Sequence, residues 1–187
     1  MLSVPERHRR GAVDFTAAGV RSDMWHHNKR HQTIPYKLYK SLPIGVKLNI
    51  SIPFESDIHM GSCPGVSLRE LMYERGVKNP YSTPLVGFGF GVIRFRIMWP
   101  GYDWDGLWLA EIPTTTLEGP VTRIELGYAV ACEYQKFLKA YAMHYPRGDK
   151  DYPLHTNRYD VHNLRLVRIF SVENNNFQAE IVHVPEN

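Results

Sequence analysis

The chain has 187 residues, a hydrophobic content of 43% and a formal net charge of +3 at pH 7. This length and composition indicate one globular domain with a sizeable core. No run of about 18 apolar residues occurs, so no membrane span is expected. The N-terminus lacks the apolar segment of a secretory signal, and the two cysteines are too few for a disulfide scaffold. We therefore expect a cytoplasmic or nuclear protein with reduced thiols.

Basic residues are concentrated near the N-terminus. Residues 1–47 hold nine Lys or Arg and three Asp or Glu, whereas the rest of the chain has a net charge of −3. Residues 1–40 are also polar and weakly periodic, so we interpret them as a basic, partly ordered arm. Residues 41–187 are expected to form a single α+β domain. A basic arm favours an anionic partner such as nucleic acid, although solvated basic termini are common without one.

The first regular elements are predicted between residues 46 and 76. Apolar and polar residues alternate from Val46 to Ile52, which predicts a half-buried strand that Pro53 ends. After a loop, Ser67 and Glu70 have the spacing of a capping box, in which each side chain satisfies a backbone donor at a helix start. A short helix is therefore expected to begin there and to stop at Gly76.

Two strands joined by an aromatic loop are predicted next. Apolar residues alternate with polar ones from Ile93 to Trp99, which is typical of a strand with one buried face. Its partner is expected from Leu107 to Ile112. The Pro-Gly and Asp-Gly pairs between the two segments are turn signals.

A long helix follows, starting at a second capping box formed by Thr122 and Glu125. It is expected to continue to about Tyr145, because Pro146 disfavours helical geometry in the residue before it. Its predicted buried face consists of Leu126, Val130, Tyr134, Phe137, Leu138 and Tyr141. Lys136 and Lys139 fall on the opposite, exposed face.

The chain ends with two β-rich segments, residues 164–173 and 177–184. The three asparagines between them tolerate positive φ and favour a tight hairpin. Hairpins and few crossovers predict an α+β fold, with a mainly antiparallel sheet of about five strands packed on one long helix and with one short helix.

The central segment resembles an uncharacterised intracellular protein family of mushroom-forming fungi. The resemblance depends on the pattern Trp-Pro-Gly-Tyr at residues 99–102 and on Gly-Pro-x-Thr-Arg-x-x-Leu at residues 119–126. It covers about a quarter of the chain. The resemblance implies a fungal source, but no activity is established for that family, so it transfers no catalytic residue.

Two groups of residues are candidates for catalysis. Gly61 to Gly65 has the outline of a nucleophile elbow around Cys63, but Pro64 has no N–H to donate to an oxyanion, so a simple turn is the alternative. Asp103 and Asp105 could form an acid pair. A hydrolase would combine Cys63 or these aspartates with a distant histidine, such as His155 or His162.

Neither a cofactor nor a metal site is predicted. The glycine-rich segment from Gly87 to Gly91 leads into a strand, whereas a phosphate loop leads into a helix N-terminus. In a helix, His27 and His31 would share one face beside His26, with Asp23 as the nearest further ligand. The segment lacks the glutamate of a His-Glu-x-x-His motif, so a basic, solvated stretch is the alternative.

Four aromatic residues surround the predicted loop. Trp99 and Trp108 lie on strands, where large rings usually serve as core anchors. Tyr102 and Trp104 lie between the turn signals and are the better candidates for recognition.

The first hypothesis is a non-enzymatic intracellular binding module that contacts a protein partner or self-associates as a homo-oligomer. Its candidate binding residues are Tyr102, Trp104, Arg7, Arg9, Arg10, Lys29 and Arg30. One alternative is a nucleic-acid-binding protein whose arm contacts phosphates, which predicts sequence-independent and salt-sensitive affinity. The other is the cysteine- or aspartate-dependent hydrolase.

Overall fold

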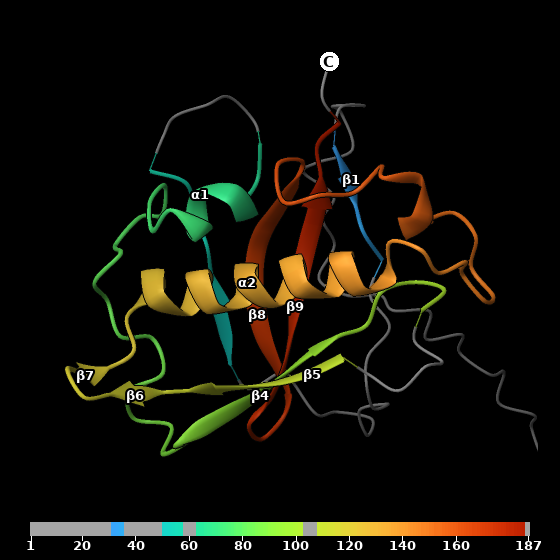
Figure 1. Cartoon of the computed structure of the whole chain (residues 1–187). Helices are drawn as coiled ribbons and strands as arrows, with labels where there is room; N and C mark the ends of the chain where they lie inside the picture. Colours follow the sequence, from blue (N-terminus) through green and yellow to red (C-terminus); the bar gives the residue numbers. More distant parts are fainter. Residues whose placement is uncertain (1–30, 36–49, 58–62, 103–107, 186–187) are drawn as a thin grey trace, which may run out of the picture.

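One long helix, α2 (Arg123–Tyr141), crosses one face of a twisted sheet (Figure 1). The computed structural model describes residues 31–35, 50–57, 63–102 and 108–185. The sheet contains β1 (Gln32–Thr33), β2 (Ser51–Pro53), β3 (Val66–Ser67), β4 (Val92–Ile97), β5 (Trp108–Pro113), β8 (Leu164–Glu173) and β9 (Asn176–His183). Outside it lie a short helix, α1 (Leu68–Met72), a hairpin of β6 (Thr115–Thr116) and β7 (Gly119–Pro120), and a 3₁₀ turn (Leu154–Thr156).

The strand order of the sheet is β2-β8-β9-β4-β5, with β1 added to β9 and β3 added to β8. Among the described strands, only the β4–β9 pair is parallel. The predicted α+β class and the mainly antiparallel sheet are confirmed, but the sheet has seven strands and not about five. The difference arises partly from β1 and β3, which have two residues each and are too short to show a periodic pattern.

The hairpin of β8 and β9 is the longest strand pairing among the described strands. Its turn forms as predicted: Asn174 has a φ of +48°, which asparagine tolerates better than most residues. The Ser171 hydroxyl donates to the Asn174 carbonyl at 2.8 Å and closes the turn. The hairpin lies at the centre of the sheet: β2 and β3 pair with β8, and β1 and β4 pair with β9.

The parallel contact between β4 and β9 is short. It pairs Arg94 with Asn176 and Phe95 with Phe177, and the Arg94 N–H donates to the Asn175 carbonyl at 2.7 Å. On the other side of the junction, the Phe95 ring lies 6.1 Å from the ring of Tyr134 on α2. This contact connects the β4–β5 pair to the rest of the sheet.

The capping box at the start of α2 is present. The Thr122 N–H donates to Glu125 Oε2 at 2.7 Å, and the Glu125 N–H donates to Thr122 Oγ1 at 3.4 Å. Hydrogen bonds from the Thr122 side chain and backbone lower the pKa of Glu125. The predicted helix face is confirmed from Leu126 to Leu138, which is buried while Lys136 is exposed, but Tyr141, the last residue predicted on this face, is only partly buried.

The predicted end of this helix is wrong by four residues, since α2 stops at Tyr141 and not at Tyr145. The chain leaves the helix because its next backbone groups bind the loop after β4. The His144 carbonyl accepts from the Tyr102 hydroxyl at 2.9 Å, and the Arg147 N–H donates to the Gly101 carbonyl at 2.8 Å. These long-range contacts have no signal in the local sequence.

The capping box predicted at Ser67 is not formed. Ser67 makes no side-chain cap hydrogen bond, because it belongs to β3 and pairs with Arg165 of β8. The helix that follows, α1, ends at Met72 and not at Gly76. Gly76 does have the positive φ expected of it, at +82°, but in the loop after the helix.

Two N-terminal predictions are described only in part. β2 contains Ser51 to Pro53, so the proline is the last strand residue, and residues 46–49 of the predicted strand lie outside the described residues. Within the predicted arm, β1 pairs with β9, and the buried Ile34 donates its N–H to the Ile181 carbonyl at 2.9 Å. Residues 1–30 and 36–40 are not described, so the division into arm and domain stays a prediction.

Phe137 and Lys136 test the orientation of α2. Phe137 is 2% exposed and packs against the rings of Trp99 and Trp108, so Phe137→Ala should lower the free energy of unfolding by about 3–5 kcal/mol. Lys136→Ala removes an exposed ion pair with Glu133 and should leave the free energy of unfolding nearly unchanged. Chemical denaturation measures both, and equal effects would contradict the described helix face.

His183, at the end of β9, makes stability depend on pH. Its ring is buried, and the ring centroid lies 4.9 Å from that of Tyr159. Burial lowers the pKa of His183 most, and the positive charge of Arg158 lowers it further. Folding therefore favours the neutral form of His183. Its contribution to the free energy of unfolding is fully present above a pH of about 6.5, the pKa of an unfolded histidine. It is lost as the pH falls through the lower pKa of the folded state.

The free energy of unfolding should accordingly decrease as the pH falls below about 6.5, and this decrease should be smaller in His183→Asn. Denaturant titrations of both proteins at several pH values provide the measurement. Identical slopes in the two proteins would show that His183 does not contribute.

Candidate functional site

Tyr102 is a structural residue. Its side chain is 3% exposed, so the prediction that it stands on an exposed recognition loop is wrong. The hydroxyl donates to the His144 carbonyl and accepts from the Leu154 N–H, both at 2.9 Å. Burial raises the pKa of this hydroxyl. Tyr102 thus ties the loop after β4 to the end of α2 and to the 3₁₀ turn.

The two tryptophans assigned to the core both pack there. Trp99 is buried and donates its indole N–H to the Tyr152 carbonyl at 3.0 Å. Trp108 is partly buried against the core and donates to Glu133 at 3.0 Å. Trp104, Asp103 and Asp105 lie outside the described residues, so the recognition role of the first and the acid pair formed by the others stay predictions.

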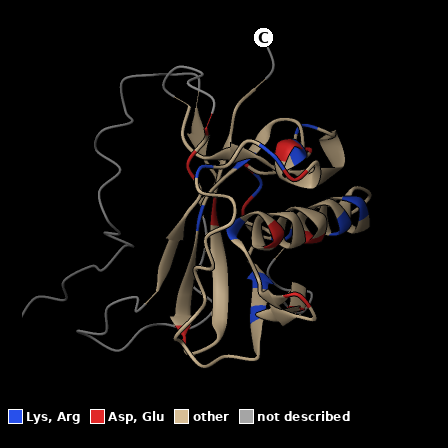
Figure 2. Cartoon of the chain, turned by 90° about the vertical axis from the view of Figure 1, so that its left-hand side faces the viewer, with Lys and Arg blue, Asp and Glu red and all other residues tan. Residues whose placement is uncertain are grey.

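The basic residues predicted to bind an anionic partner also lie outside the described residues. They are Arg7, Arg9, Arg10, Lys29 and Arg30. The described part of the chain is electrically balanced, with 13 Lys or Arg and 13 Asp or Glu. Figure 2 shows the two signs interspersed along the chain. The nucleic-acid hypothesis therefore depends on the arm alone.

Cys63 has a histidine neighbour that the sequence analysis did not identify. Its Sγ lies 3.5 Å from Nε2 of His31, the residue before β1. The two histidines considered from sequence are engaged elsewhere: the His155 ring lies 4.3 Å from Tyr145, and His162 contacts Arg69 at 3.2 Å. A thiol beside an imidazole is the arrangement in which a histidine can accept the thiol proton.

The segment after Cys63 is fixed on β8. The Arg165 guanidinium donates to the carbonyls of Pro64 and Gly65 at 3.0 and 2.7 Å. Gly65 has a φ of +74°, and a Cβ there would lie 2.3 Å from the Leu166 carbonyl oxygen. Only glycine fits at this position, so any other residue at 65 would displace the segment from β8.

No group of three His, Cys, Asp or Glu side chains with metal-binding geometry occurs among the described residues. His26, His27 and Asp23 are not described, so the hypothesis of a metal site near His31 is not tested. No helix in the same residues is long and apolar enough to span a bilayer.

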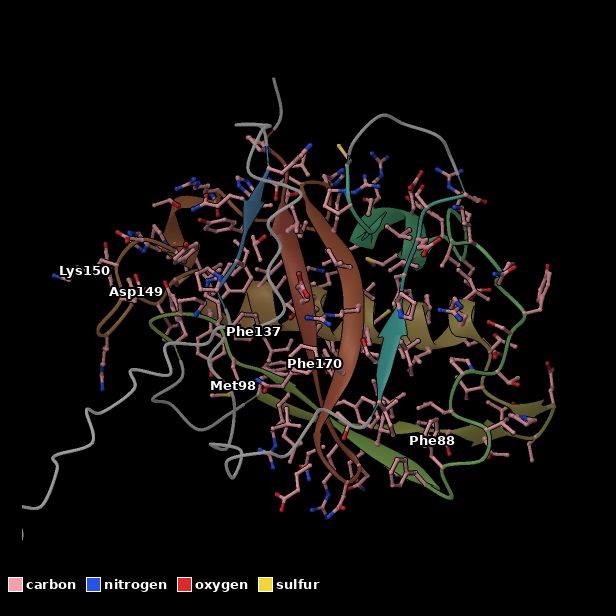
Figure 3. All side chains as sticks on the ribbon, turned by 180° about the vertical axis from the view of Figure 1, so that it is seen from behind. Phe88, Met98, Phe137, Asp149, Lys150 and Phe170 are labelled. Atoms are coloured by element: carbon pink, nitrogen blue, oxygen red, sulfur yellow. The ribbon has the colours of Figure 1, made fainter. Side chains whose placement is uncertain are left out.

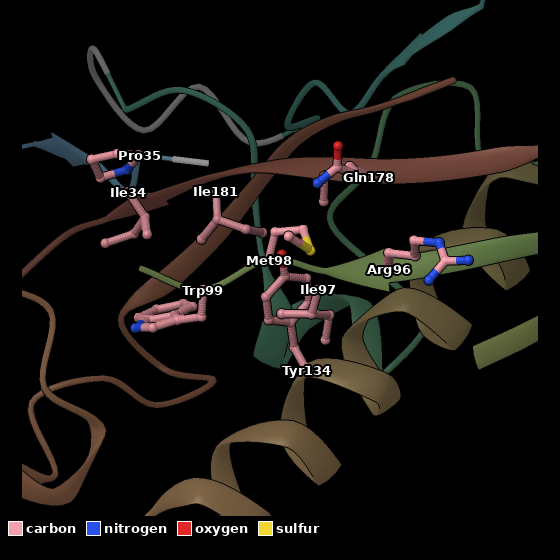
Figure 4. Close-up of a pocket in the computed structure, with 10 residues that line it drawn as sticks. Ile34, Pro35, Arg96, Ile97, Met98, Trp99, Tyr134, Gln178 and Ile181 are labelled. Carbon is pink, nitrogen blue, oxygen red and sulfur yellow. The ribbon is translucent and has the colours of Figure 1, made fainter. Parts of the chain in front are cut away.

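A small cavity lies where β4 and β9 diverge (Figure 4). Ile34, Ile97 and Ile181 form its apolar wall, and Arg96 and Gln178 also line it. Its volume is about 10 Å³, which is room for roughly one water molecule. This cavity is therefore too small to be a substrate site.

Large apolar side chains are exposed at one end of the molecule. We call this group the end surface: it consists of Tyr81, Val86 and Phe88 from the loop before β4 and Leu117 from the β6–β7 hairpin. Tyr81 is 83% exposed, and Leu117 is fully exposed. Figure 3 shows Phe88 at this end, away from α1.

Hydrogen bonds join the loop to the residues that flank the hairpin, Thr114 before it and Arg123 after it. At one end of the loop, the Thr114 N–H donates to the Gly91 carbonyl at 3.1 Å. At the other end, the Arg123 N–H donates to the Ser82 carbonyl at 2.7 Å. No site was predicted in residues 77–91, where only the glycine-rich segment from Gly87 to Gly91 was considered; the large apolar residues Tyr81, Val86 and Phe88 are the signal that could have identified this surface.

Comparison with known proteins gives no relative: no family model, no curated protein and no solved structure matches this chain. The resemblance to a fungal family and the fungal source therefore stay predictions.

The Cys63–His31 contact predicts selective thiol reactivity. In the Cys132→Ser variant, Cys63 should react with a thiol reagent at neutral pH at least about tenfold faster than Cys132 does in Cys63→Ser. His31→Asn should remove this difference, because the proton acceptor is lost. Cys132 is a suitable reference, since both thiols are free and partly exposed. Equal rates in the two single-cysteine proteins would show that His31 does not activate Cys63.

Proposed function

We propose that this chain is a non-enzymatic interaction module that binds a protein partner through the end surface. The observation that carries the proposal is the exposure of four large apolar side chains on two adjoining segments. Single exposed apolar residues are common, but a group of them at one site is typical of a surface that a partner covers.

Ring contacts hold Phe88 of the end surface in place. The rings of Phe88 and Phe90 are stacked at 6.3 Å, and Phe90 lies edge-on to the buried Phe177 at 6.4 Å. The exposed Phe88 is therefore linked to the core through one intermediate ring. A preformed apolar site binds without first ordering its side chains, which favours affinity.

The proposed compartment is the cytoplasm or nucleus. Both cysteines, Cys63 and Cys132, are free, which supports a reducing environment. Self-association belongs to the same proposal, because a second copy is one of the protein partners that such a module can bind.

The end surface is tested by the double variant Phe88→Ser, Leu117→Ser. The wild-type protein and the variant are used as bait, and the captured proteins are compared by quantitative mass spectrometry. A partner that uses this surface should be lost from the variant, while the melting temperature should change little because both side chains are exposed.

Met143→Ser is the matched control, since Met143 is also an exposed apolar residue but follows α2, outside the end surface. It should retain the partner. A partner that binds all three proteins equally, or none that binds the wild type above background, would contradict the proposed role of the end surface.

Thiol chemistry is a second candidate function, favoured by the 3.5 Å contact of Cys63 with His31. Acyl transfer is disfavoured, because Pro64 cannot donate the backbone hydrogen bond that usually stabilises the oxyanion after the nucleophile. The reactivity of Cys63 in the single-cysteine variants decides whether this candidate deserves a substrate search.

A further inference from the structure

The outer edge of β5 is available for pairing. β5 lies at the end of the strand order, and among the described residues no strand pairs with its second edge. Leu109 is 47% exposed, and Glu111 and Pro113 are exposed as well. Natural proteins usually cover or shorten such edges, because unpaired backbone groups can bind another strand. The opposite edge strand, β2, has three residues in the described part of the chain.

Two hydrogen bonds show which backbone groups face outward. The Thr114 N–H donates to Gly91, so the alternation of an antiparallel pair directs the N–H and C=O of Ile112 and Ala110 toward β4. Independently, the Arg94 N–H donates to Asn175 on the far side of β4. The residues between them, Leu109 and Glu111, therefore present their N–H and C=O to solvent, and Pro113 presents a C=O alone.

We propose that a second copy of this chain pairs with β5, in antiparallel orientation, about a two-fold axis at Ala110. The proposal rests on the interaction role inferred above, and it identifies one partner and a surface separate from the end surface. In this register Leu109 of one copy lies opposite Glu111 of the other. Each such pair exchanges two hydrogen bonds, so the symmetric interface contains four between backbones.

The register with its axis one residue further along is less favourable. Placing the axis at Glu111 would bring two carboxylates directly opposite each other, which is destabilising, and would pair Leu109 with Pro113, which has no N–H. With the axis at Ala110, each Glu111 lies beside Arg94 of its own strand pair, 3.9 Å away, and opposite an apolar Leu109. Charge and hydrogen bonding thus select the same register.

Side-chain size is also compatible with close approach. Ala110 lies on the axis in a pair without hydrogen bonds, where the two strands are closest, and its methyl group is small. The exposed part of Leu109 becomes covered by the neighbouring strand. The resulting sheet is continuous through both copies, which makes the interface isologous and closed at a dimer.

The dimer would also present two end surfaces. The hairpin of β6 and β7 follows β5 directly, and the two β5 strands run in opposite directions. The end surfaces therefore face opposite ends of the assembly, where they can bind two partners or two sites on a repetitive partner with increased avidity.

Glu111→Pro tests the hydrogen bonds of the interface. Proline removes the outward N–H and leaves the hydrogen bonds to β4 intact, as is tolerated on an edge strand. The matched control is Glu111→Ala, which loses the same carboxylate but keeps the N–H. By sedimentation equilibrium, the wild type and Glu111→Ala should dimerise, and Glu111→Pro should dissociate at least about tenfold more readily, as expected for the loss of two net hydrogen bonds.

Ala110→Cys tests the register. In a Cys63→Ser, Cys132→Ser background, the two introduced thiols should lie across a pair with Cα atoms about 4.5 Å apart, within the range of a disulfide. Mild oxidation should therefore give a covalent dimer, and Leu109→Cys in the same background should give much less. Equal cross-linking of the two variants would contradict the register.

A wild-type protein that is monomeric at every concentration, or dimers that Glu111→Pro leaves unchanged, would overturn the proposal. Either result would leave the end surface untested, because that surface is probed by capture with Phe88→Ser, Leu117→Ser. A protein that dimerises through β5 but captures no partner would support this inference and contradict the proposed role of the end surface.

Discussion

The short parallel contact between β4 and β9 determines how the sheet is organised. Two residue pairs and the hydrogen bond from Arg94 to Asn175 connect the β4–β5 pair to the β8–β9 hairpin. Phe95 and Phe177 are adjacent at this junction and fully buried, and Tyr134 of α2 packs over Phe95. A parallel pair needs a long connection between its strands, and the segment from β5 through α2 to β8 provides it. The junction thus fixes β4, β5 and α2 relative to the hairpin.

Both proposed interaction surfaces follow from this arrangement. Because β9 occupies one side of β4 and β5 occupies the other, β5 is the last strand of the order, and no strand in the described part of the chain pairs with its outer edge. The loop before β4 and the hairpin after β5 start from paired strands, which brings them together at one end of the molecule. Phe88 stacks on Phe90, and Phe90 lies edge-on to Phe177, so these rings connect that end to the junction. The positions of both proposed surfaces therefore depend on the order of the strands in the sheet.

The sequence predicted several features that depend on residues close together in the chain. The capping box at Thr122, the buried Phe137 and the positive φ of Asn174 each depend on residues close in sequence, and each is present. The burial of Tyr102 and the Cys63–His31 contact depend on segments far apart in the chain, and no local sequence pattern indicates either of them. The candidate site was therefore predicted much less well than the fold, because loops are positioned by distant backbone partners.

Hydrogen exchange at β5 shows whether this strand pairs with a second copy of the chain. The amides of Ala110 and Ile112 are bonded to β4 and should be protected at every protein concentration. The amides of Leu109 and Glu111 face the free edge, so they should exchange rapidly in dilute solution and become protected as the concentration rises. If they exchange rapidly at all concentrations while Ala110 and Ile112 stay protected, β5 is not an interface between copies of this chain.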